Sequence, residues 1–280
     1  MPTSSARSSS GCPPERHDLA SRQGRGTATL ILVTNDDGIT SPGLHALYDE
    51  LKRLDQVIVV APDAERSAVG HAITVTTPLR VQEFRRGEEV MGFATNGTPA
   101  DCVKIAVRTL LDPPPDLVVS GINRGSNMGT NVIYSGTVSA ATEARILGIP
   151  SLAISLDTHG NADWTYAAVV GRRLAAQVLE HGLPPRVLLN VNVPNLPASR
   201  IRGLRVTRQG DSRFVEGFVV REDPRRQPYY WLTGSYEVDD DDPETDGWAV
   251  ANGYVSVTPI SFDLTAHAAR AELVRWGLEA

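Results

Sequence analysis

Two adjacent carboxylates, Asp36 and Asp37, directly follow an apolar run typical of a buried strand. A hydroxyl group, Ser67, and an amide, Asn123, follow two later runs of the same kind. Because ligands bind outside the carboxyl ends of parallel strands, these four side chains are expected to converge at one sheet edge. Donors that are all oxygen suit Mg²⁺, Mn²⁺ or Ca²⁺ rather than zinc, which prefers His or Cys, and a cation would neutralise the paired acids. The alternative is a plain polar turn, since Asp-Gly is a common turn dipeptide.

A glycine-rich segment at 121–136 is the second chemical signal. Glycines recur there among Asn and Ser residues, and a helix is expected to follow. Bare backbone N–H groups and a helix N-terminus make a phosphate site, whereas the alternative is an ordinary flexible loop. Its spacing differs from that of a dinucleotide-binding fingerprint. The candidate phosphate or substrate contacts are Asn96, Gly125, Asn127, Ser135, Gly136 and Thr137.

Four further residues are weaker candidates for the same site. His71 would position substrate or transfer a proton, and Arg66 would bind phosphate, but a single loop histidine or arginine is weak evidence. Tyr134 would stack on a base or simply pack. Asn96 itself would either reach this edge or merely cap the next helix. Cys102 is expected in the core.

The elements that must position these residues alternate between strand and helix. Short apolar runs predict strands, and Ser-Pro and Thr-Pro pairs predict capped helices. The predicted strands are 29–33, 56–61, 116–120, 151–155 and 187–193, with a hairpin or short strands over 73–95. The predicted helices are 42–54, 99–111, 137–147, 163–180 and 266–278. This order predicts an α/β fold, a parallel sheet with helices on both faces, followed by a β-rich extension over about 200–280.

Composition narrows the classes of function. The 280 residues carry a net charge of −6, which argues against a nucleic-acid partner, and no apolar run is long enough to span a membrane. Two cysteines, Cys12 and Cys102, cannot build a disulfide framework, so a cytoplasmic location is expected. Only two lysines occur, Lys52 and Lys104, and a P-loop motif is absent.

Two segments are expected to lie outside the chemistry. Residues 1–27 are rich in Ser and Arg and poor in large apolar side chains, so they are expected to form a disordered tail before a domain at 28–280. The acidic segment 237–246 is expected to be a solvated loop, because it lacks the spacing and the glycine of an EF-hand.

Six ordered segments carry a resemblance to a known family. They are TNDDGITSPG, APDAERSAVGHAIT, NGTPADCV, PDLVVSGINRGSNMGTNVIYSGTVSAATEARILGIP, LNVNVPNLP and GYVSVTPISFDLTAH. In this order they resemble the SurE family of survival-protein nucleotidases, over about residues 29–270. Two positions depart from the family pattern, since Ala68 and Ala144 stand where glycine is common. Both are expected to narrow the space around a substrate.

The resemblance implies a Rossmann-like domain and metal-dependent hydrolysis of nucleoside 5′- and 3′-monophosphates, with polyphosphate as a further substrate in some members. It implies one divalent cation per subunit, held by Asp36, Asp37, Ser67 and Asn123. It also implies a homodimer or homotetramer in which C-terminal segments are exchanged between subunits.

The predicted reaction is metal-assisted hydrolysis of a phosphomonoester, with Asp36 or Asp37 also serving as general acid or base. Which acid does so, and whether one is instead a nucleophile, is left open. One rival is an aspartyl-phosphate phosphatase, although such enzymes use an Asp-x-Asp pair and a later lysine. A second rival is a phosphate or nucleotide sensor without turnover.

Overall fold

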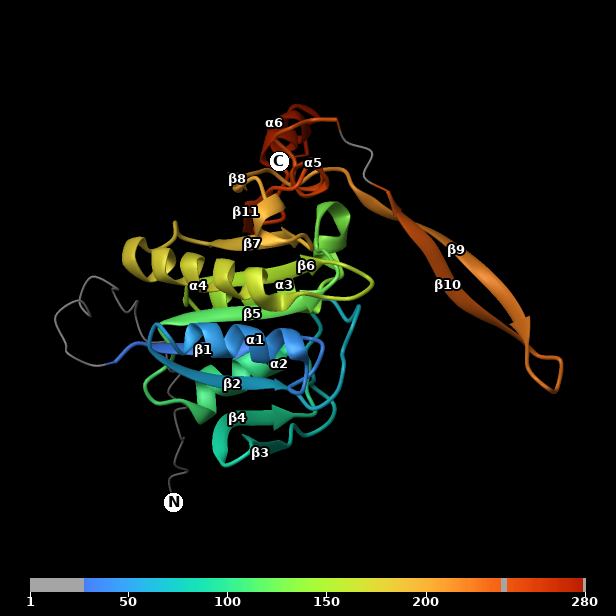
Figure 1. Ribbon diagram of the computed structural model, residues 1–280. Coiled ribbons are helices and arrows are strands. Elements are labelled where there is room, and N and C mark those ends of the chain that lie inside the picture. Colours follow the sequence, from blue (N-terminus) through green and yellow to red (C-terminus); the bar gives the residue numbers. More distant parts are fainter. Residues whose placement is uncertain (1–27, 238–240, 279–280) are drawn as a thin grey trace, which may run out of the picture.

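The computed structural model describes residues 28–237 and 241–278, so the tail expected at 1–27 lies outside the described residues. One nine-stranded sheet forms the body, in the order β3-β4-β2-β1-β5-β6-β7-β11-β8 (Figure 1). Its six central strands are parallel. They are β1 (Leu30–Thr34), β2 (Gln56–Pro62), β4 (Glu89–Thr95), β5 (Leu117–Arg124), β6 (Ser151–Asp157) and β7 (Val187–Pro194). At the edges lie β3 (Val81–Arg86), β11 (Val255–Ser261) and β8 (Leu204–Val206).

Helices cover both faces of this sheet, which confirms the predicted α/β class. α1 (Pro42–Leu51) and α4 (Trp164–His181) pack on one face, and α2 (Pro99–Ile105) and α3 (Gly136–Ile146) on the other (Figure 1). Cys102 on α2 and Ala144 on α3 are both fully buried in the second layer. The methyl group of Ala144 therefore fills the core, and the expectation that it narrows the substrate space is wrong.

The direction of winding reverses at β1. From β1 the chain builds β2 and β4 on one side, then crosses to β5 on the other side of β1. In open α/β sheets such a reversal opens a crevice at the carboxyl ends of the two strands, where ligands bind. The fold thus brings together the ends of β1 and β5, which carry Asp36, Asp37 and Asn123.

The strand β5 is longer than predicted. It continues through Gly121 to Arg124, so the first four residues of the expected loop 121–136 belong to the sheet. A Cβ atom at Gly121 would lie 2.3 Å from the Ile154 carbonyl oxygen, so glycine here permits close strand packing. The remainder is also ordered in part, since Gly129–Ile133 forms a 3₁₀-helix, η3.

One helix ends earlier than predicted, and another reaches its predicted end with a change of helix type. Ser41 caps α1 by accepting a hydrogen bond from the Leu44 N–H group, but the helix ends at Leu51. Thr98 and Asp101 form a capping box at α2, which turns into a π-type stretch, Ala106–Leu110. Each capped start confirms the Ser-Pro and Thr-Pro signals.

The C-terminal region is rich in β-structure, as predicted, and one hairpin leaves the body. β9 (Arg213–Glu222) and β10 (Pro228–Glu237) form a two-stranded antiparallel arm that projects away from the sheet (Figure 1). The helix α5 (Asp246–Ala251) was not predicted, whereas α6 (His267–Arg275) lies within the predicted closing helix. Every helix in the described ranges is too short or too polar to cross a bilayer.

The acidic segment differs from expectation at its end. Asp246 is fully buried as the first residue of α5, behind the N-cap Thr245, and is not a solvated charge. Neighbouring Asp242 forms an ion pair with Arg208 at 2.5 Å. The segment is therefore partly structural.

Candidate active site

A tight turn holds Asp36 and Asp37 between β1 and α1. The side-chain amide of Asn35 donates to the Gly38 carbonyl oxygen at 3.0 Å and to Ser41 Oγ at 2.8 Å. Gly38 adopts a φ of +94°, which glycine tolerates and other residues rarely adopt. Sequence analysis did not single out Asn35, although asparagine often organises a turn through its own side chain.

Asp36 is buried against the start of α3. The hydroxyl of Thr137 donates to Asp36 Oδ1 at 2.5 Å. A Cβ atom at Gly136 would lie 2.7 Å from the Cβ atom of Asp36, so only glycine allows this approach. Burial raises the pKa of Asp36, while hydrogen bonds from Thr137 and Gly136 act against the rise. Thr137 and Gly136 thus fix the carboxylate.

Asp37 lies beside the end of β5. Its Oδ2 accepts a hydrogen bond from the Arg124 N–H group at 3.3 Å. Burial, then the negative charge of Asp36 and that of Glu65, raise the pKa of Asp37 to about 6. Negative charge therefore gathers here without full compensation, which is the electrostatic condition that a divalent cation relieves. Sequence analysis missed Glu65, which follows β2 at the same sheet edge.

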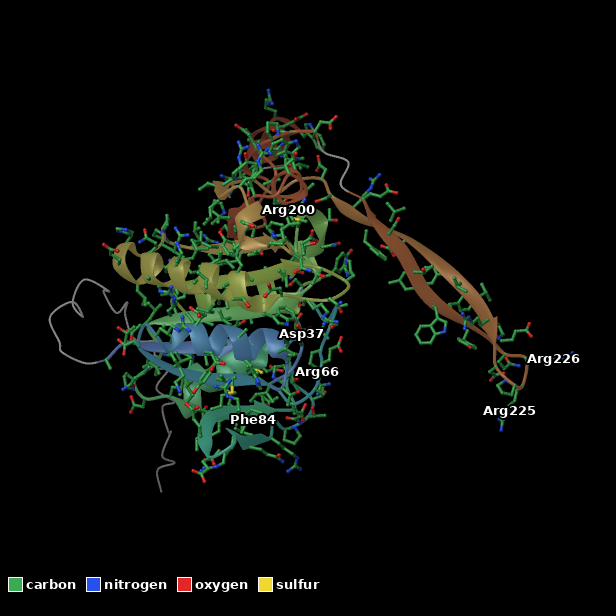
Figure 2. The ribbon with its side chains drawn as sticks, viewed as in Figure 1. Asp37, Arg66, Phe84, Arg200, Arg225 and Arg226 are labelled. Atoms are coloured by element: carbon green, nitrogen blue, oxygen red, sulfur yellow. The ribbon has the colours of Figure 1, made fainter. Side chains whose placement is uncertain are left out.

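Hydrogen bonds tie the segments of Ser67 and Asn123 to the two acids. The Arg66 N–H group donates to the Asp36 carbonyl oxygen at 2.7 Å, next to Ser67 in the chain. Ser67 donates its hydroxyl hydrogen to Glu65 at 2.6 Å. Asn123 precedes Arg124 and donates its amide hydrogen to the Gly125 carbonyl oxygen at 2.8 Å, so its own side-chain oxygen is the atom suited to a cation. Figure 2 shows Asp37 and Arg66 at the same edge of the body.

The donor set is one of oxygens only. Among residues 28–237 and 241–278, no three His, Cys, Asp or Glu side chains are arranged to hold a metal ion. The predicted site has two carboxylate ligands and draws its other donors from Ser67 and Asn123. The buried Oδ1 atom of Asn35, next to the pair, also has no hydrogen-bond partner. These donors fit Mg²⁺, Mn²⁺ or Ca²⁺.

Three of the predicted phosphate contacts lie at the start of α3. Ser135 is its N-cap and accepts a hydrogen bond from the Val138 N–H group at 3.1 Å, and Gly136 and Thr137 contact Asp36. Gly125, which follows β5, adopts a φ of +105°. Backbone N–H groups and the positive end of the helix dipole therefore lie beside the carboxylates.

Asn96 and Asn127, the other two predicted substrate contacts, make hydrogen bonds to parts of the protein away from the two acids. Asn96 accepts a hydrogen bond from the Arg80 N–H group at 2.7 Å and donates to the Pro78 carbonyl oxygen, so its side chain holds the 78–80 segment. Asn127 is buried and donates to Ser155 Oγ at 2.8 Å. These contacts give both asparagines structural roles, and contact with substrate remains a prediction for them.

A buried clamp holds the turn between β5 and α3. Asp246 Oδ2 accepts from the Gly129 N–H group at 3.1 Å, and its Oδ1 accepts from the Gly210 N–H group at 2.9 Å. Gln209 donates to the Gly129 carbonyl oxygen at 2.7 Å. Burial raises the pKa of Asp246 despite these bonds. Sequence analysis missed this residue because its acidic neighbours suggested a solvated loop.

Comparisons with known proteins show which family the chain is similar to. Residues 31–216 match the family model described as survival protein SurE. A protein of Syntrophobacter fumaroxidans named 5′-nucleotidase SurE is 55% identical over 248 residues, covering 89% of this chain and 99% of the relative. One of the same name from Chlorobaculum tepidum is 49% identical, covering 89% and 95%. The crystal structure of the SurE protein from Aquifex aeolicus has a TM-score of 0.78 and 43% identity, covering 89% of this chain and 99% of that one.

Proposed function

The chain belongs to the SurE family of survival proteins, and we propose that it is a divalent-metal-dependent nucleotidase. It hydrolyses nucleoside 5′-monophosphates, and also 3′-monophosphates, to nucleoside and phosphate. The observation that carries the proposal is the Asp36–Asp37 pair at the β1/β5 crevice, beside the N-terminus of α3. Relatives named 5′-nucleotidase, with up to 55% identity in the comparisons above, support the same activity.

Asp36, Asp37, Ser67 and Asn123 would hold one divalent cation. When bound, such a cation polarises a phosphoryl oxygen and lowers the pKa of a water molecule. The chain keeps the ligands in place through the hydrogen bonds from Thr137 to Asp36 and from the Arg124 N–H group to Asp37. This pre-organisation means that little reorganisation is needed during the reaction.

The reaction requires a water oxygen to bond to phosphorus while the bond from phosphorus to the nucleoside oxygen breaks. A proton leaves the water, and the departing nucleoside oxygen gains one. The positive end of the α3 helix dipole stabilises the charge on the phosphoryl oxygens. Asp37 is less buried than Asp36, so it is the acid of the pair that water reaches more readily.

These contacts recognise the oxygens of a terminal phosphoryl group, whichever oxygen of the nucleoside carries it. Oxygens of 5′- and 3′-monophosphates and of short polyphosphate chains present the same chemistry to backbone N–H groups and a cation. A side activity that releases phosphate from polyphosphate is therefore part of the proposal.

The proposed assembly is a homodimer or homotetramer in which the C-terminal region is exchanged. The arm exposes large apolar side chains on both strands, including Phe218, Tyr230 and Trp231, each at least 60% exposed. Apolar surface of this extent is typical of an interface. A cytoplasmic location rests only on the two cysteines, of which Cys102 is a free, buried thiol.

Replacement of either acid tests the proposal. Phosphate release from AMP, GMP, CMP and 3′-AMP is measured with and without Mn²⁺ for the wild type, Asp36→Asn and Asp37→Asn. We expect both variants to lose at least 100-fold in kcat, on the order of the loss when a main electrostatic group is removed, with the fold retained by circular dichroism. The control is Asp49→Asn, an exposed acid on α1 that pairs with Arg86. Near-wild-type turnover in an Asp36 or Asp37 variant contradicts the assignment.

The same experiment separates the two rival functions. A sensor binds phosphate or AMP but releases none with any cation. An aspartyl-phosphate phosphatase would leave a covalent phosphoenzyme that acid quenching traps. We expect release with Mn²⁺ and no trapped intermediate.

A further inference from the structure

Tyr134 is an exposed aromatic residue that immediately precedes Ser135, one of the proposed phosphate contacts. Within residues 28–200, which the structure describes throughout, Tyr134 is the only exposed Phe, Trp or Tyr, with 61% of its surface accessible. The other exposed aromatic side chains in the described parts of the chain lie on the arm or next to α6. Ile133, its neighbour, is 69% exposed. Two large apolar side chains thus face solvent together on a body that otherwise buries or half-buries its aromatic rings.

The backbone of Tyr134 connects two loops of the site. Its carbonyl oxygen accepts a hydrogen bond from the Gly70 N–H group at 3.1 Å, three residues after Ser67. Tyr134 also ends the 3₁₀-helix η3 and immediately precedes Ser135, the N-cap of α3. The ring is therefore carried by a backbone that is fixed at both the Ser67 loop and the start of α3.

The distance along the backbone from Tyr134 to the proposed phosphate site suits the size of a nucleotide. Tyr134 is two residues before Gly136, a backbone span of at most about 7 Å, and Gly136 packs on Asp36. In a nucleoside monophosphate, the ribose separates the base from the phosphate by a comparable length. A phosphate held beside the start of α3 by the proposed cation therefore places a base near the backbone that carries the Tyr134 ring.

We propose that Tyr134, supported by Ile133, is the surface on which the nucleobase of the substrate stacks. This rests on the proposed nucleotidase function and adds a specificity residue to it. Stacking tolerates any base, because every base has a π-face, so the contact selects nucleotides over phosphate esters without a base rather than one nucleotide over another. Two occupants compete for the surface, namely a nucleobase and a second copy of this chain.

The test compares AMP with ribose 5-phosphate, which has the same phosphate and leaving oxygen but no base. For Tyr134→Ala we expect KM for AMP to rise about tenfold with kcat nearly unchanged, and KM for ribose 5-phosphate to stay within about twofold. Tyr134→Phe keeps the ring and should behave as the wild type. Ile146→Ala is the matched control, since it removes an exposed apolar side chain at the far end of α3.

The outcomes are distinguishable. An unchanged KM for AMP, or equal rises for both substrates, overturns the proposal. A change in sedimentation without a change in KM assigns the surface to a second copy and also overturns it. If the wild type hydrolyses neither substrate with Mn²⁺, the nucleotidase function itself fails, whereas calorimetric titration of the same variants with AMP and inorganic phosphate still tests the base contact.

Discussion

Ala68 follows the proposed metal ligand Ser67 and adopts a φ of +56°, in the left-handed region. A Cβ atom costs roughly 1–2 kcal/mol in this region, because it approaches the following carbonyl oxygen. Ala68 also stands where the resemblance leads us to expect glycine. Alanine in place of glycine at position 68 therefore strains the backbone, in addition to any effect on the space around a substrate.

Substitution at Ala68 tests this cost. We expect Ala68→Gly to raise the free energy of unfolding by up to about 1 kcal/mol, since relief of the left-handed strain exceeds the added chain entropy of glycine. Ala68→Val should lower it, because a β-branched residue is a genuine outlier at positive φ. Urea denaturation measures both. Ala72→Gly is the control, at an exposed residue of the same loop outside the positive-φ set, where glycine should lower stability. Equal effects at 68 and 72 would contradict the strain argument.

At the scale of elements, the sequence predicted the central sheet well, because buried parallel strands read as apolar runs and capped helix starts have local signals. The prediction from sequence was wrong where contacts between distant residues determine the local structure. Gly121 looked like a loop residue, but it lies inside β5 because the Ile154 carbonyl oxygen approaches it closely. Asp246 looked solvated, but it is buried because distant Gly129 and Gly210 supply hydrogen bonds. Long-range partners of this kind have no signature in a single sequence.

The same limit applied to the site. The alternation of strands and helices predicted a parallel sheet. The residues after its strands, Asp36, Asp37, Ser67 and Asn123, were therefore expected at one edge of that sheet. Asn96 was selected for its place before a capped helix and Asn127 for its place in the glycine-rich segment, but their side chains hold neighbouring backbone and Ser155. Glu65 was missed because its influence on Asp37 arises only after folding.

The junction between α2 and the loop that follows β2 depends on one carboxylate. Asp101 accepts hydrogen bonds from the Thr98 N–H group at 2.9 Å and from the Thr74 N–H group at 3.0 Å. Burial alone would raise the pKa of Asp101, but the hydrogen bonds from Thr74 and Thr98 outweigh it, and the pKa is lowered. A carboxyl group with a lowered pKa in the fold stabilises the protein above its unfolded pKa of about 4, and this contribution is lost as pH falls through the folded value.

Replacement of Asp101 should therefore have an effect that depends on pH. Asp101→Asn is expected to lower the free energy of unfolding by about 1–2 kcal/mol at pH 7, with the difference from wild type shrinking as pH falls below about 4. Urea denaturation at pH 7, 5 and 3.5 measures it. Glu83→Gln, an exposed acid on β3, is the control and should change stability by less than about 0.5 kcal/mol. A constant difference across this range would contradict the role of the ionised carboxylate.

At the scale of the whole molecule, the base of the arm packs against the turn that precedes α3 in the proposed site. The residues that lead into β9 hold the turn before α3, since the Thr130 N–H group donates to the Ser212 carbonyl oxygen at 3.1 Å. A Cβ atom at Gly129 would lie 2.0 Å from that same oxygen. The root of the arm is thus packed against the segment that carries the proposed phosphate contacts, while its apolar strands extend outward (Figure 1).

Assembly is therefore expected to depend on apolar side chains along the arm, away from its root. The double variant Phe218→Ser and Trp231→Ser removes one exposed aromatic side chain from each strand. Phe218 pairs with Leu232 and Trp231 with Val219, so the two lie on opposite faces of the arm. We expect it to sediment as a monomer at a concentration where the wild type forms the proposed dimer or tetramer, because hot spots in interfaces are enriched in large aromatic residues. Ile146→Ser, which removes an exposed apolar side chain from the body, should leave the assembly unchanged. Since residues 209–212 and Asp246 keep their contacts with Gly129, AMP should still bind to the variant, which separates loss of assembly from collapse of the site. If the double variant sediments like the wild type, these side chains do not hold the subunits together, and the arm needs another partner to cover its apolar strands.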